Sequence, residues 1–570
     1  MRTIYQYVRP KLPRMGLIFS IKTFGTIIEL FLPWLLSSII DDCAAVGDVR
    51  GAWLRGGLML LCALAALFGN ACANRMSCAV SRDVTKQLRY DLFEKTLHLS
   101  CAQVDRFTVP SLMSRVNSDV YNVHTMLDRM QRLGVRAPML LLGGILVALT
   151  LEPVLALVLI AMLPLLGVVL VYVSRHGVPL FEASQQSLDR LVRKVQENMT
   201  GARVIKALSK MDWEREKFDE ASKENVRRES KASSVMALTG PVMNLLLNVG
   251  LAAVIWVGAV RVQSGLTQPG KIIAFLSYFT IILNALLMIS RIFTYYSKGL
   301  ASARRVAEVL NAPVELEPQK LLAQTDDAVL RFRDVAFSYN KSHVDLGPLS
   351  FAVRPGKTLG IIGPTGSGKT TVLALLQRFY DPDAGEILLK GQPLKSLSRE
   401  ALRGSIGVVQ QNDFLLADTI DENIRFGRSI EEAAIRDAAA SAQAEFITRK
   451  EEGFQTKLTA RGANLSGGQK QRVLIARALA GNPSILLLDD CSSALDYKTD
   501  AKLRHALKAR KGVAATVIVA QRISAVRDCD QILVLDAGRQ MGLGTHAELM
   551  QTCPMYRELY QLQLGEEATA

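Results

Sequence analysis

The chain has 570 residues, of which 49% are hydrophobic and 21% are charged. This length exceeds what one hydrophobic core organises, and the two fractions argue against a uniform globule and for a chain divided between lipid and water. The formal net charge of +15 admits nucleic acid, anionic lipid or phosphate as partners. Because the clustered basic residues fall between apolar stretches, the sequence predicts a membrane protein without a nucleic-acid partner.

Eight cysteines are spread along the chain without any Cys-x-x-Cys pair. None has histidine companions at the spacing of a zinc site. They are interpreted as free thiols.

Six apolar stretches are candidates for membrane-spanning helices. The basic segment before the first stretch has no small-residue cleavage site after it, so it is interpreted as a cytoplasmic elbow rather than a signal peptide. The six stretches are centred on residues 27–40, 58–69, 137–151, 155–173, 245–260 and 272–289.

The connections between these stretches alternate in length and charge. Those after the first, third and fifth are short, and those after the second and fourth are long and charged. This pattern predicts that both termini and the two long links are cytoplasmic. The long links have helical periodicity, so each is expected to extend two membrane helices beyond the bilayer, with turns at 110–120 and 210–221 that either dock on a domain beneath or are merely solvated.

The pattern changes after residue 310. Residues 311–327 are polar, contain two prolines and are interpreted as a linker between a transmembrane domain (1–310) and a second domain (328–570). In the second domain short apolar strands alternate with amphipathic helices. This alternation is typical of an α/β domain with a mainly parallel sheet.

A glycine-rich motif, GPTGSGKTT, follows an apolar strand and precedes a helix at residues 363–371. Backbone N–H groups of such a loop surround phosphates, Lys369 reaches their outer oxygens, and Thr370 can bind Mg²⁺. Asp489 ends the strand SILLLD, where it is expected to hold Mg²⁺ through water. The pentapeptide LSGGQ (465–469) stands before the helix KQRVLIARALA, and no common structural requirement explains it.

With these motifs the chain resembles a half-transporter of the ATP-binding-cassette (ABC) exporters with the type IV, multidrug-exporter-like fold. The resemblance covers almost the whole chain. It implies a membrane domain of six transmembrane helices with long cytoplasmic extensions, followed by an α/β P-loop ATPase domain. ATP and Mg²⁺ are the implied cofactors, and a bacterial cytoplasmic membrane is the implied location.

The resemblance assigns roles to individual residues. Tyr339 would stack on adenine, with a core aromatic as the alternative, and Gln411, chosen over Gln410 by its spacing from Asp413, would contact Mg²⁺. The full set implied for binding ATP is Tyr339, Gly363, Pro364, Thr365, Gly366, Ser367, Gly368, Lys369, Thr370, Thr371, Gln411 and Asp489, with Thr370, Gln411 and Asp489 at the metal.

In that family two cassettes bind head to tail around two ATP molecules. The signature residues Ser466, Gly467, Gly468 and Gln469 would therefore cap an ATP bound to the partner chain, and residues 493–496 would face that partner. A helix N-terminus is a suitable lid for a terminal phosphate.

Three positions depart from the family pattern. Asp490 stands where a glutamate is the usual general base, and Gln521 replaces the switch histidine. Ala460 stands where many exporters have a glutamate in a loop that couples the cassettes. Losing one methylene at residue 490 withdraws the carboxylate, and glutamine carries no positive charge near neutral pH.

With these departures, the chain resembles the degenerate-site subunit of heterodimeric ABC exporters. The implied partner is a second half-transporter with Glu and His at the matching positions, in a lipid bilayer, and the transported substrate is an amphipathic small molecule or peptide. An exporter-fold importer of siderophores and an ATP-binding regulatory subunit remain the alternatives.

Two features of the membrane half are open at this point. Lys22 and Glu29 are seven residues apart on one helix face, and they either serve function or lie near the interface. Aromatic residues of the last span either line a substrate cavity or pack; they are Phe275, Tyr278, Phe279, Phe293, Tyr295 and Tyr296.

Overall fold

The structure, a computed structural model, describes residues 2–314, 318–341, 343–411, 413–491, 494–510 and 512–567. The chain divides into two compact units. The first comprises residues 1–97 and 108–312, and the second comprises residues 98–107 and 313–570. The short segment 98–107 thus belongs with the C-terminal unit although it lies within the N-terminal sequence.

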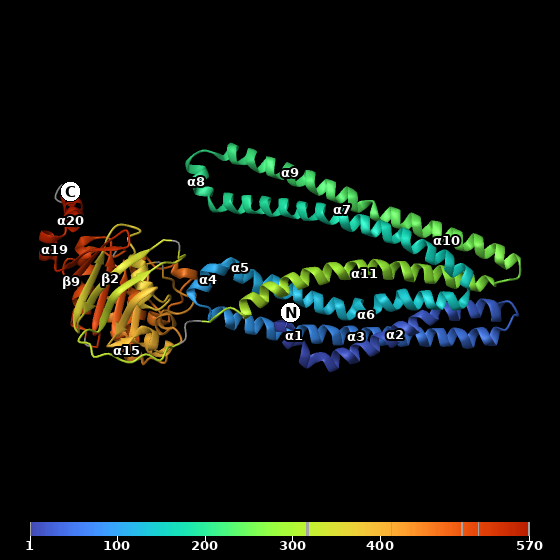
Figure 1. The fold of residues 1–570 in the computed structure, drawn as a ribbon, viewed down its shortest axis with the longest axis horizontal. Coiled ribbons are helices and arrows are strands. Elements are labelled where there is room, and N and C mark those ends of the chain that lie inside the picture. Colours follow the sequence, from blue (N-terminus) through green and yellow to red (C-terminus); the bar gives the residue numbers. More distant parts are fainter. Residues whose placement is uncertain are drawn as a thin grey trace. The chain divides into compact units, whose positions relative to one another are not determined.

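The first unit is helical (Figure 1). Its elements are α1 (Arg2–Val8), η1 (Arg9–Lys11), α2 (Leu12–Ser38), η2 (Ile39–Ala44), α3 (Val49–Leu97), α5 (Val109–Ser114), η3 (Arg115–Asp119), α6 (Val120–Leu151), α7 (Pro153–Thr200), α8 (Ala202–Ala207), α9 (Met211–Ala237), α10 (Thr239–Gln263) and α11 (Pro269–Leu310).

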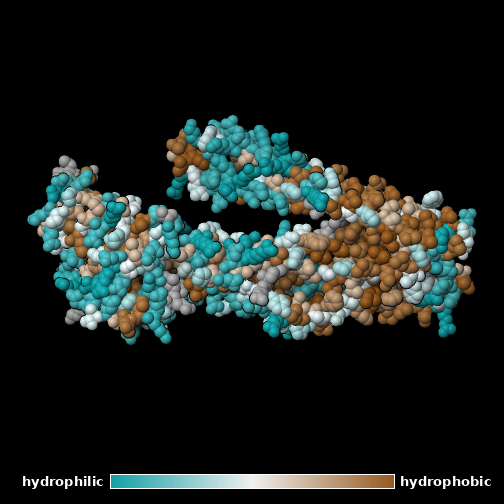
Figure 2. All heavy atoms as spheres, in the orientation of Figure 1, coloured by the Kyte–Doolittle hydropathy of each residue, from teal (hydrophilic) through white to brown (hydrophobic). Residues whose placement is uncertain are grey.

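Among the described residues, six helices are long and apolar enough to cross a membrane. Each contains one of the predicted apolar stretches, which confirms the prediction of six spans. Figure 2 shows their apolar residues gathered in one band across the helical unit. The six run over Thr3–Ala44, Val49–Leu97, Val109–Leu151, Pro153–Thr200, Met211–Gln263 and Pro269–Leu310.

The long links form helical extensions, but their turns lie about ten residues earlier than predicted. The first turn surrounds α4 (Cys101–Phe107), and the second surrounds α8. Pro110, within the predicted turn at 110–120, occupies the first turn of α5, where its missing N–H costs nothing. Gly201 and the positive φ of Ser209 (52°) break the second link before Met211.

Polar contacts join the helices of the first unit. The buried Lys22 donates from Nζ to Asn74 Oδ1 at 3.0 Å, and Arg136 pairs with Glu29 at 2.7 Å. Lys22 and Glu29 therefore contact two different helices, α3 and α6.

The aromatic residues of α11 divide into two groups. Phe275, Tyr278 and Phe279 are buried, and the hydroxyl of Tyr278 donates to the carbonyl of Leu30 at 2.6 Å. Phe293 is 67% exposed and Tyr296 is 40% exposed. Packing explains the first group, and these exposed rings are left to meet lipid, substrate or another chain.

The second unit contains two sheets and the helices around them. A four-stranded antiparallel sheet has the order β2-β1-β4-β5, and a six-stranded sheet has the order β10-β9-β3-β8-β7-β6. The strands are β1 (Leu330–Phe337), β2 (Leu346–Val353), β3 (Lys357–Ile362), β4 (Ala384–Leu389), β5 (Gln392–Pro393), β6 (Ile406–Val409), β7 (Ile485–Asp489), β8 (Ala515–Ala520), β9 (Gln531–Asp536) and β10 (Arg539–Gly544).

All pairings in the larger sheet are parallel except that of β10 with β9. This confirms the predicted α/β domain with a mainly parallel sheet. The remaining elements of the unit are α12 (Lys369–Leu376), η4 (Leu394–Ser396), α13 (Arg399–Ser405), α14 (Ile420–Arg425), α15 (Glu432–Ser441), η5 (Glu445–Ile447), η6 (Gly453–Gln455), η7 (Ala460–Gly462), α16 (Gly467–Ala480), α17 (Tyr497–Ala509), α18 (Ile523–Val526), α19 (His546–Thr552) and α20 (Pro554–Glu567).

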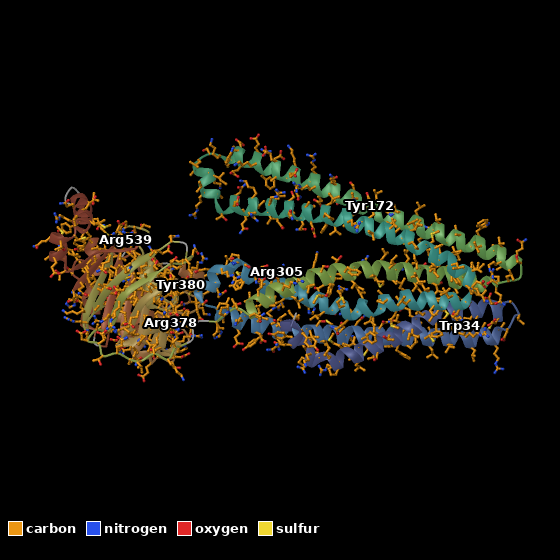
Figure 3. All side chains as sticks on the ribbon, in the orientation of Figure 1. Trp34, Tyr172, Arg305, Arg378, Tyr380 and Arg539 are labelled. Atoms are coloured by element: carbon orange, nitrogen blue, oxygen red, sulfur yellow. The ribbon has the colours of Figure 1, made fainter. Side chains whose placement is uncertain are left out.

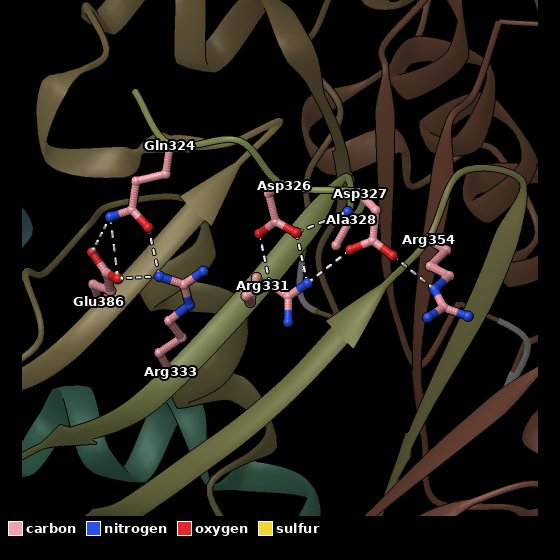
Figure 4. A network of polar contacts seen from close by, with 8 residues as sticks. All are labelled: Gln324, Asp326, Asp327, Ala328, Arg331, Arg333, Arg354 and Glu386. Atoms are coloured by element: carbon pink, nitrogen blue, oxygen red, sulfur yellow. Dashed lines mark hydrogen bonds and ion pairs between the residues drawn. The ribbon is translucent and has the colours of Figure 1, made fainter. Parts of the chain in front are cut away.

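The chain that leads into β1 is fixed to the antiparallel sheet by ion pairs (Figure 4). Asp326 accepts two hydrogen bonds of 2.6 Å from Arg331 and a third from the N–H of Ala328 at 3.0 Å. Arg333 pairs with Glu386 at 2.8 Å. The second half of the predicted linker is therefore an ordered edge of this unit.

Candidate functional site: a nucleotide cavity

The glycine-rich motif forms the turn between β3 and α12. Gly363 has no room for a side chain, because a Cβ there would lie 2.0 Å from the carbonyl oxygen of Leu535. Gly366 and Gly368 have φ values of 84° and 98°, which side chains disfavour. The local sequence therefore permits one loop path, which leads into the N-terminus of α12.

Lys369 is buried inside this loop, with 9% of its surface exposed. Its Nζ donates to the carbonyls of Gly363 and Pro364 at 2.8 and 2.7 Å, and lies 3.4 Å from Ser367 Oγ. Burial lowers the pKa of Lys369, while Asp489 and Asp490 oppose this effect. The lysine is thus preorganised at the loop, with its ammonium group next to the positions where phosphate oxygens bind.

A cavity of about 230 Å³ brings the predicted residues together. Its wall includes Tyr339, the loop, Asp489 at the end of β7, and both departures, Asp490 and Gln521. The lining residues are Tyr339, Asp345, Thr365, Gly366, Gly368, Lys369, Thr370, Thr371, Gln411, Asp489, Asp490, Val519, Ala520 and Gln521. The loop also contains Gly363, Pro364 and Ser367, which contact Lys369 Nζ but are not among the residues that line the cavity.

Tyr339 stands at one end of the site with 45% of its surface exposed. Its hydroxyl is 3.4 Å from Thr371 Oγ1, and its backbone N–H donates to Asp345 Oδ2 at 2.8 Å. A half-exposed ring fixed at its backbone is suited to stacking on a planar base. Sequence reasoning missed Asp345, because SHVDLG matches no motif.

The carboxylates at the other end have different environments. Asp489 ends β7 and is 6% exposed; burial and the neighbouring Asp490 raise its pKa, and Lys369 lowers it. Asp490 has a φ of 47° and donates its backbone N–H to Val519 at 2.9 Å. Burial raises its pKa, while Arg522, Gln411 and Lys369 lower it.

Gln411 and Gln521 approach from two loops. Gln411 Nε2 lies 3.5 Å from Asp490 Oδ2. The carbonyl of Gln521 accepts from Gln563 Nε2 at 2.9 Å, and Gln563 Oε1 accepts from the N–H of Ile523 at 2.7 Å. A glutamine of the C-terminal helix α20 therefore holds the backbone on both sides of Arg522, a contact that no local sequence signal indicates.

The donor set fits a magnesium ion. Thr370, Gln411 and Asp489 offer hydroxyl, amide and carboxylate oxygens, the hard ligands that Mg²⁺ prefers. Within the described ranges no group of three or more His, Cys, Asp or Glu residues could hold a metal. An ion here would therefore depend on phosphate and water for its remaining ligands, as Mg²⁺ does in nucleotide sites.

The signature residues form a separate feature. Ser466 caps α16: its Oγ accepts from the N–H of Gln469 at 3.3 Å, and Gln469 Oε1 accepts from the N–H of Ser466 at 3.1 Å. Gly467 and Gly468 begin this helix, and a Cβ at Gly468 would lie 3.0 Å from the carbonyl oxygen of Ala494. Among the described residues that line the nucleotide cavity, none belongs to the signature.

The segment expected to face a partner is only partly visible. Ser493 lies outside the described residues. Asp496 caps α17, since its carboxylate accepts from the N–H of Thr499 at 3.1 Å. Ala460 lies in the short helix η7 and offers only a methyl group.

Comparisons with known proteins agree with this fold. Residues 15–286 match the ABC transporter transmembrane region, and residues 346–493 match the ABC transporter domain. An uncharacterized ABC transporter ATP-binding protein of Mycobacterium tuberculosis is 34% identical over 97% of this chain and 96% of its own length. The Bacillus subtilis protein YfiB, also an uncharacterized ABC transporter ATP-binding protein, is 33% identical over all of both chains.

Among solved structures, a bacterial Atm1-family ABC exporter with ATP bound superimposes with a TM-score of 0.80. It is 25% identical and covers 98% of both chains. This chain belongs to the ABC transporters. It is an exporter-type half-transporter, a membrane-embedded protein whose ATPase domain binds ATP and drives transport.

Proposed function

We propose that this chain is the degenerate-site subunit of a heterodimeric exporter of amphipathic molecules. The observation that carries the proposal is the composition of one cavity. Asp490 and Gln521 stand on its wall beside a complete set of phosphate-binding residues. Substitutions at both hydrolytic positions, with the binding positions retained, favour a site that holds ATP and turns it over slowly.

Binding rests on this chain's own residues. Tyr339 stacks on adenine, the loop 363–371 surrounds the phosphates, and Lys369 neutralises their outer oxygens. Thr370, Gln411 and Asp489 would hold Mg²⁺, which screens phosphate charge when bound. The adenine contact and the backbone N–H groups of the loop do not involve residues 490 and 521, whereas Gln411 also contacts Asp490.

Hydrolysis is expected to be slow for a geometric reason. Asp490 stands at the position where the resemblance implies a glutamate as general base. Its side chain is one methylene shorter than glutamate, which withdraws the carboxylate by about 1 to 1.5 Å and costs on the order of a hundredfold in rate. Gln521 adds a second loss, because an amide neither carries positive charge nor exchanges a proton near neutral pH.

The intact signature completes a catalytic site on a different chain. Ser466, Gly467, Gly468 and Gln469 stand at the N-terminus of α16, where free backbone N–H groups and the helix dipole favour a terminal phosphate. The partner is a half-transporter with Glu and His at the positions of Asp490 and Gln521. The domains are 1–310, 311–327 and 328–570, with both termini and the ATPase domain cytoplasmic.

In the transport cycle, ATP binds the closed pair of cassettes better than the open pair. This difference in affinity shifts the population towards closure and alters access to the substrate path between membrane helices. Hydrolysis at the partner's site resets the complex. ATP retained at this chain's site keeps the cassettes associated between turnovers.

Expression of the chain with and without its genetic neighbour tests this proposal. The measurements are the mass of the intact complex and its ATPase rate. We expect a complex of two different chains with high turnover and a weakly active preparation of the single chain. Rapid turnover by a pure homodimer would contradict the proposal.

A further inference from the structure

Tyr380 connects the base-binding end of the cavity with the segment 98–107. Its ring meets Tyr339 edge to face, with centroids 5.1 Å apart and planes at 86°, and it also contacts Phe337 at 5.4 Å. Its hydroxyl donates to the carboxylate of Asp105 on α4. Figure 3 labels Tyr380 beside Arg378. One side chain thus contacts both the ring proposed to stack on adenine and α4.

The segment 98–107 has further contacts within the same compact unit. Leu99 forms an antiparallel bridge with Val314, near the start of the stretch 313–570 of the second unit. Ser100 and Cys101 line a small cavity together with residues at the end of α12 and in α13. The hydroxyl of Tyr380 therefore adds a polar contact at the far end of a segment that is already placed at its beginning.

We propose that Tyr380 is a positioning residue that couples adenine binding at Tyr339 to the docking of segment 98–107 through its hydrogen bond with Asp105. The inference rests on the proposed adenine contact of Tyr339. It assigns to the nucleotide site of this chain a role that needs no hydrolysis. Occupancy of that site sets how firmly a loop of the membrane sequence is held.

The geometry gives the coupling a physical basis. Tyr339 is half-exposed, and its ring contacts in the structure are edge-to-face ones with Phe337 and Tyr380. A base stacked on its open face restricts the Tyr339 ring, and the ring of Tyr380 packed against it is then restricted as well. Because a hydroxyl bond to a carboxylate is short and directional, a fixed ring favours one position of Asp105.

The electrostatics agree with an intact bond. Burial raises the pKa of Tyr380, and the hydrogen bond with Asp105 and its negative charge raise it further. The phenol therefore stays protonated and remains the donor. Asp105 is exposed, so its position depends on such a contact more than a buried side chain would.

Coupling between two binding events is reciprocal. If nucleotide strengthens the docking of segment 98–107, docking strengthens nucleotide binding by the same factor. Typical couplings are about fivefold to a hundredfold. The factor by which nucleotide strengthens docking and the factor by which docking strengthens nucleotide binding, measured independently, must therefore be equal.

Hydrogen–deuterium exchange measures how nucleotide affects the docking of segment 98–107. It is carried out on the full-length chain, in the complex in which the chain is expressed. The probe is the magnesium complex of adenylyl imidodiphosphate, which is not hydrolysed. We expect nucleotide to slow exchange in residues 98–107 by about fivefold or more. In Tyr380→Phe, which keeps the ring, we expect no slowing at saturating nucleotide and a dissociation constant raised by the same factor. Equal slowing in the wild type and in Tyr380→Phe would overturn the proposal.

Two variants of Asp105 separate coupling from packing, because neither alters the hydrophobic core. Asp105→Asn retains an oxygen acceptor for the phenol, and Asp105→Ala removes it. We expect the nucleotide response to survive in the first and to be lost in the second. Identical responses in both would show that the hydroxyl bond is not the link.

Tyr339→Ala distinguishes failure of the link from failure of the proposed adenine contact. If Tyr339→Ala weakens nucleotide binding while Tyr380→Phe keeps the full response, the link alone is wrong. If Tyr339→Ala leaves affinity and response unchanged, the adenine contact is wrong. Tyr339→Phe retains the stacking face, so we expect the nucleotide response of residues 98–107 to survive in this variant.

Discussion

The two ends of the nucleotide cavity differ in what their residues retain. At the phosphate loop, Gly363 and Lys369 satisfy tight steric and hydrogen-bonding demands. At the other end, the proposed function assigns the general-base and switch positions to Asp490 and Gln521, whose side chains differ in length or charge from the glutamate and histidine that it expects there. Under that proposal, binding and chemistry in one cavity depend on separable residues.

The largest expected effect comes from the signature. Gly467→Asp places a carboxylate where the partner's terminal phosphate would lie, so we expect ATPase of the complex to fall about a hundredfold or more. ATP binding to the chain's own cavity should stay unchanged, because Gly467 does not line it. A steady-state phosphate-release assay and a nucleotide-binding assay on one preparation check both parts. Unchanged turnover would show that this signature serves no active site.

Repairing the hydrolytic end should give the next largest effect. The double variant Asp490→Glu with Gln521→His restores side-chain reach and a titratable group. With the second catalytic site disabled, we expect ATPase to rise at least about tenfold over the unrepaired complex. The control is the conservative pair Asp490→Asn with Gln521→Asn, which should give no gain. No rise in the repaired variant would show that other residues limit this site.

Lys369→Ala removes the charged group at the binding end. A hydrogen bond to a charged group contributes about 1.5 to 3 kcal/mol, so we expect ATP affinity of this site to fall roughly tenfold to a hundredfold. Lys357 begins β3, the strand that precedes the loop, but it is exposed and pairs with Asp530, so Lys357→Ala is the matched control. Equilibrium binding of a fluorescent ATP analogue measures both. Equal losses in the two variants would indicate a general disturbance of β3.

The smallest effect concerns stability. Hydrogen bonds from Arg331 hold the pKa of Asp326 below its usual range. A carboxyl with a depressed folded-state pKa stabilises the fold above its unfolded pKa of about 3.9, and this contribution is lost as pH falls towards the folded value. We expect Asp326→Asn to lower the Tm of the C-terminal unit by a few degrees at pH 7, with a smaller difference as pH is lowered below about 4. Thermal scans at several pH values measure this, and a pH-independent difference would contradict it.

The sequence predicted those parts of the molecule that depend on local patterns. Hydrophobic runs identified the six spans, and the glycine pattern identified the loop before Lys369. Contacts between distant segments have no such signal. Gln563 reaches the switch loop across 42 residues, and Tyr380 reaches Asp105 across 275.

The misplaced first turn has the same origin. A proline such as Pro110 can end a helix that precedes it or occupy the first turn of a helix that follows it. Which of these occurs depends on the conformation of the backbone just before the proline. Thr108, with a φ of 61°, ends the turn there. Asp345 escaped notice because its role is to hold the backbone of Tyr339 rather than to match a motif.

The nucleotide bound to this chain tests the central claim most directly. The complex is incubated with Mg²⁺ and 8-azido-ATP labelled on either the α- or the γ-phosphate, irradiated during turnover, and its two chains are separated. The account predicts that this chain carries both labels in equal amount, whereas its partner loses the γ label. Loss of the γ label from this chain at the partner's rate would show that Asp490 and Gln521 support hydrolysis, and would contradict the account.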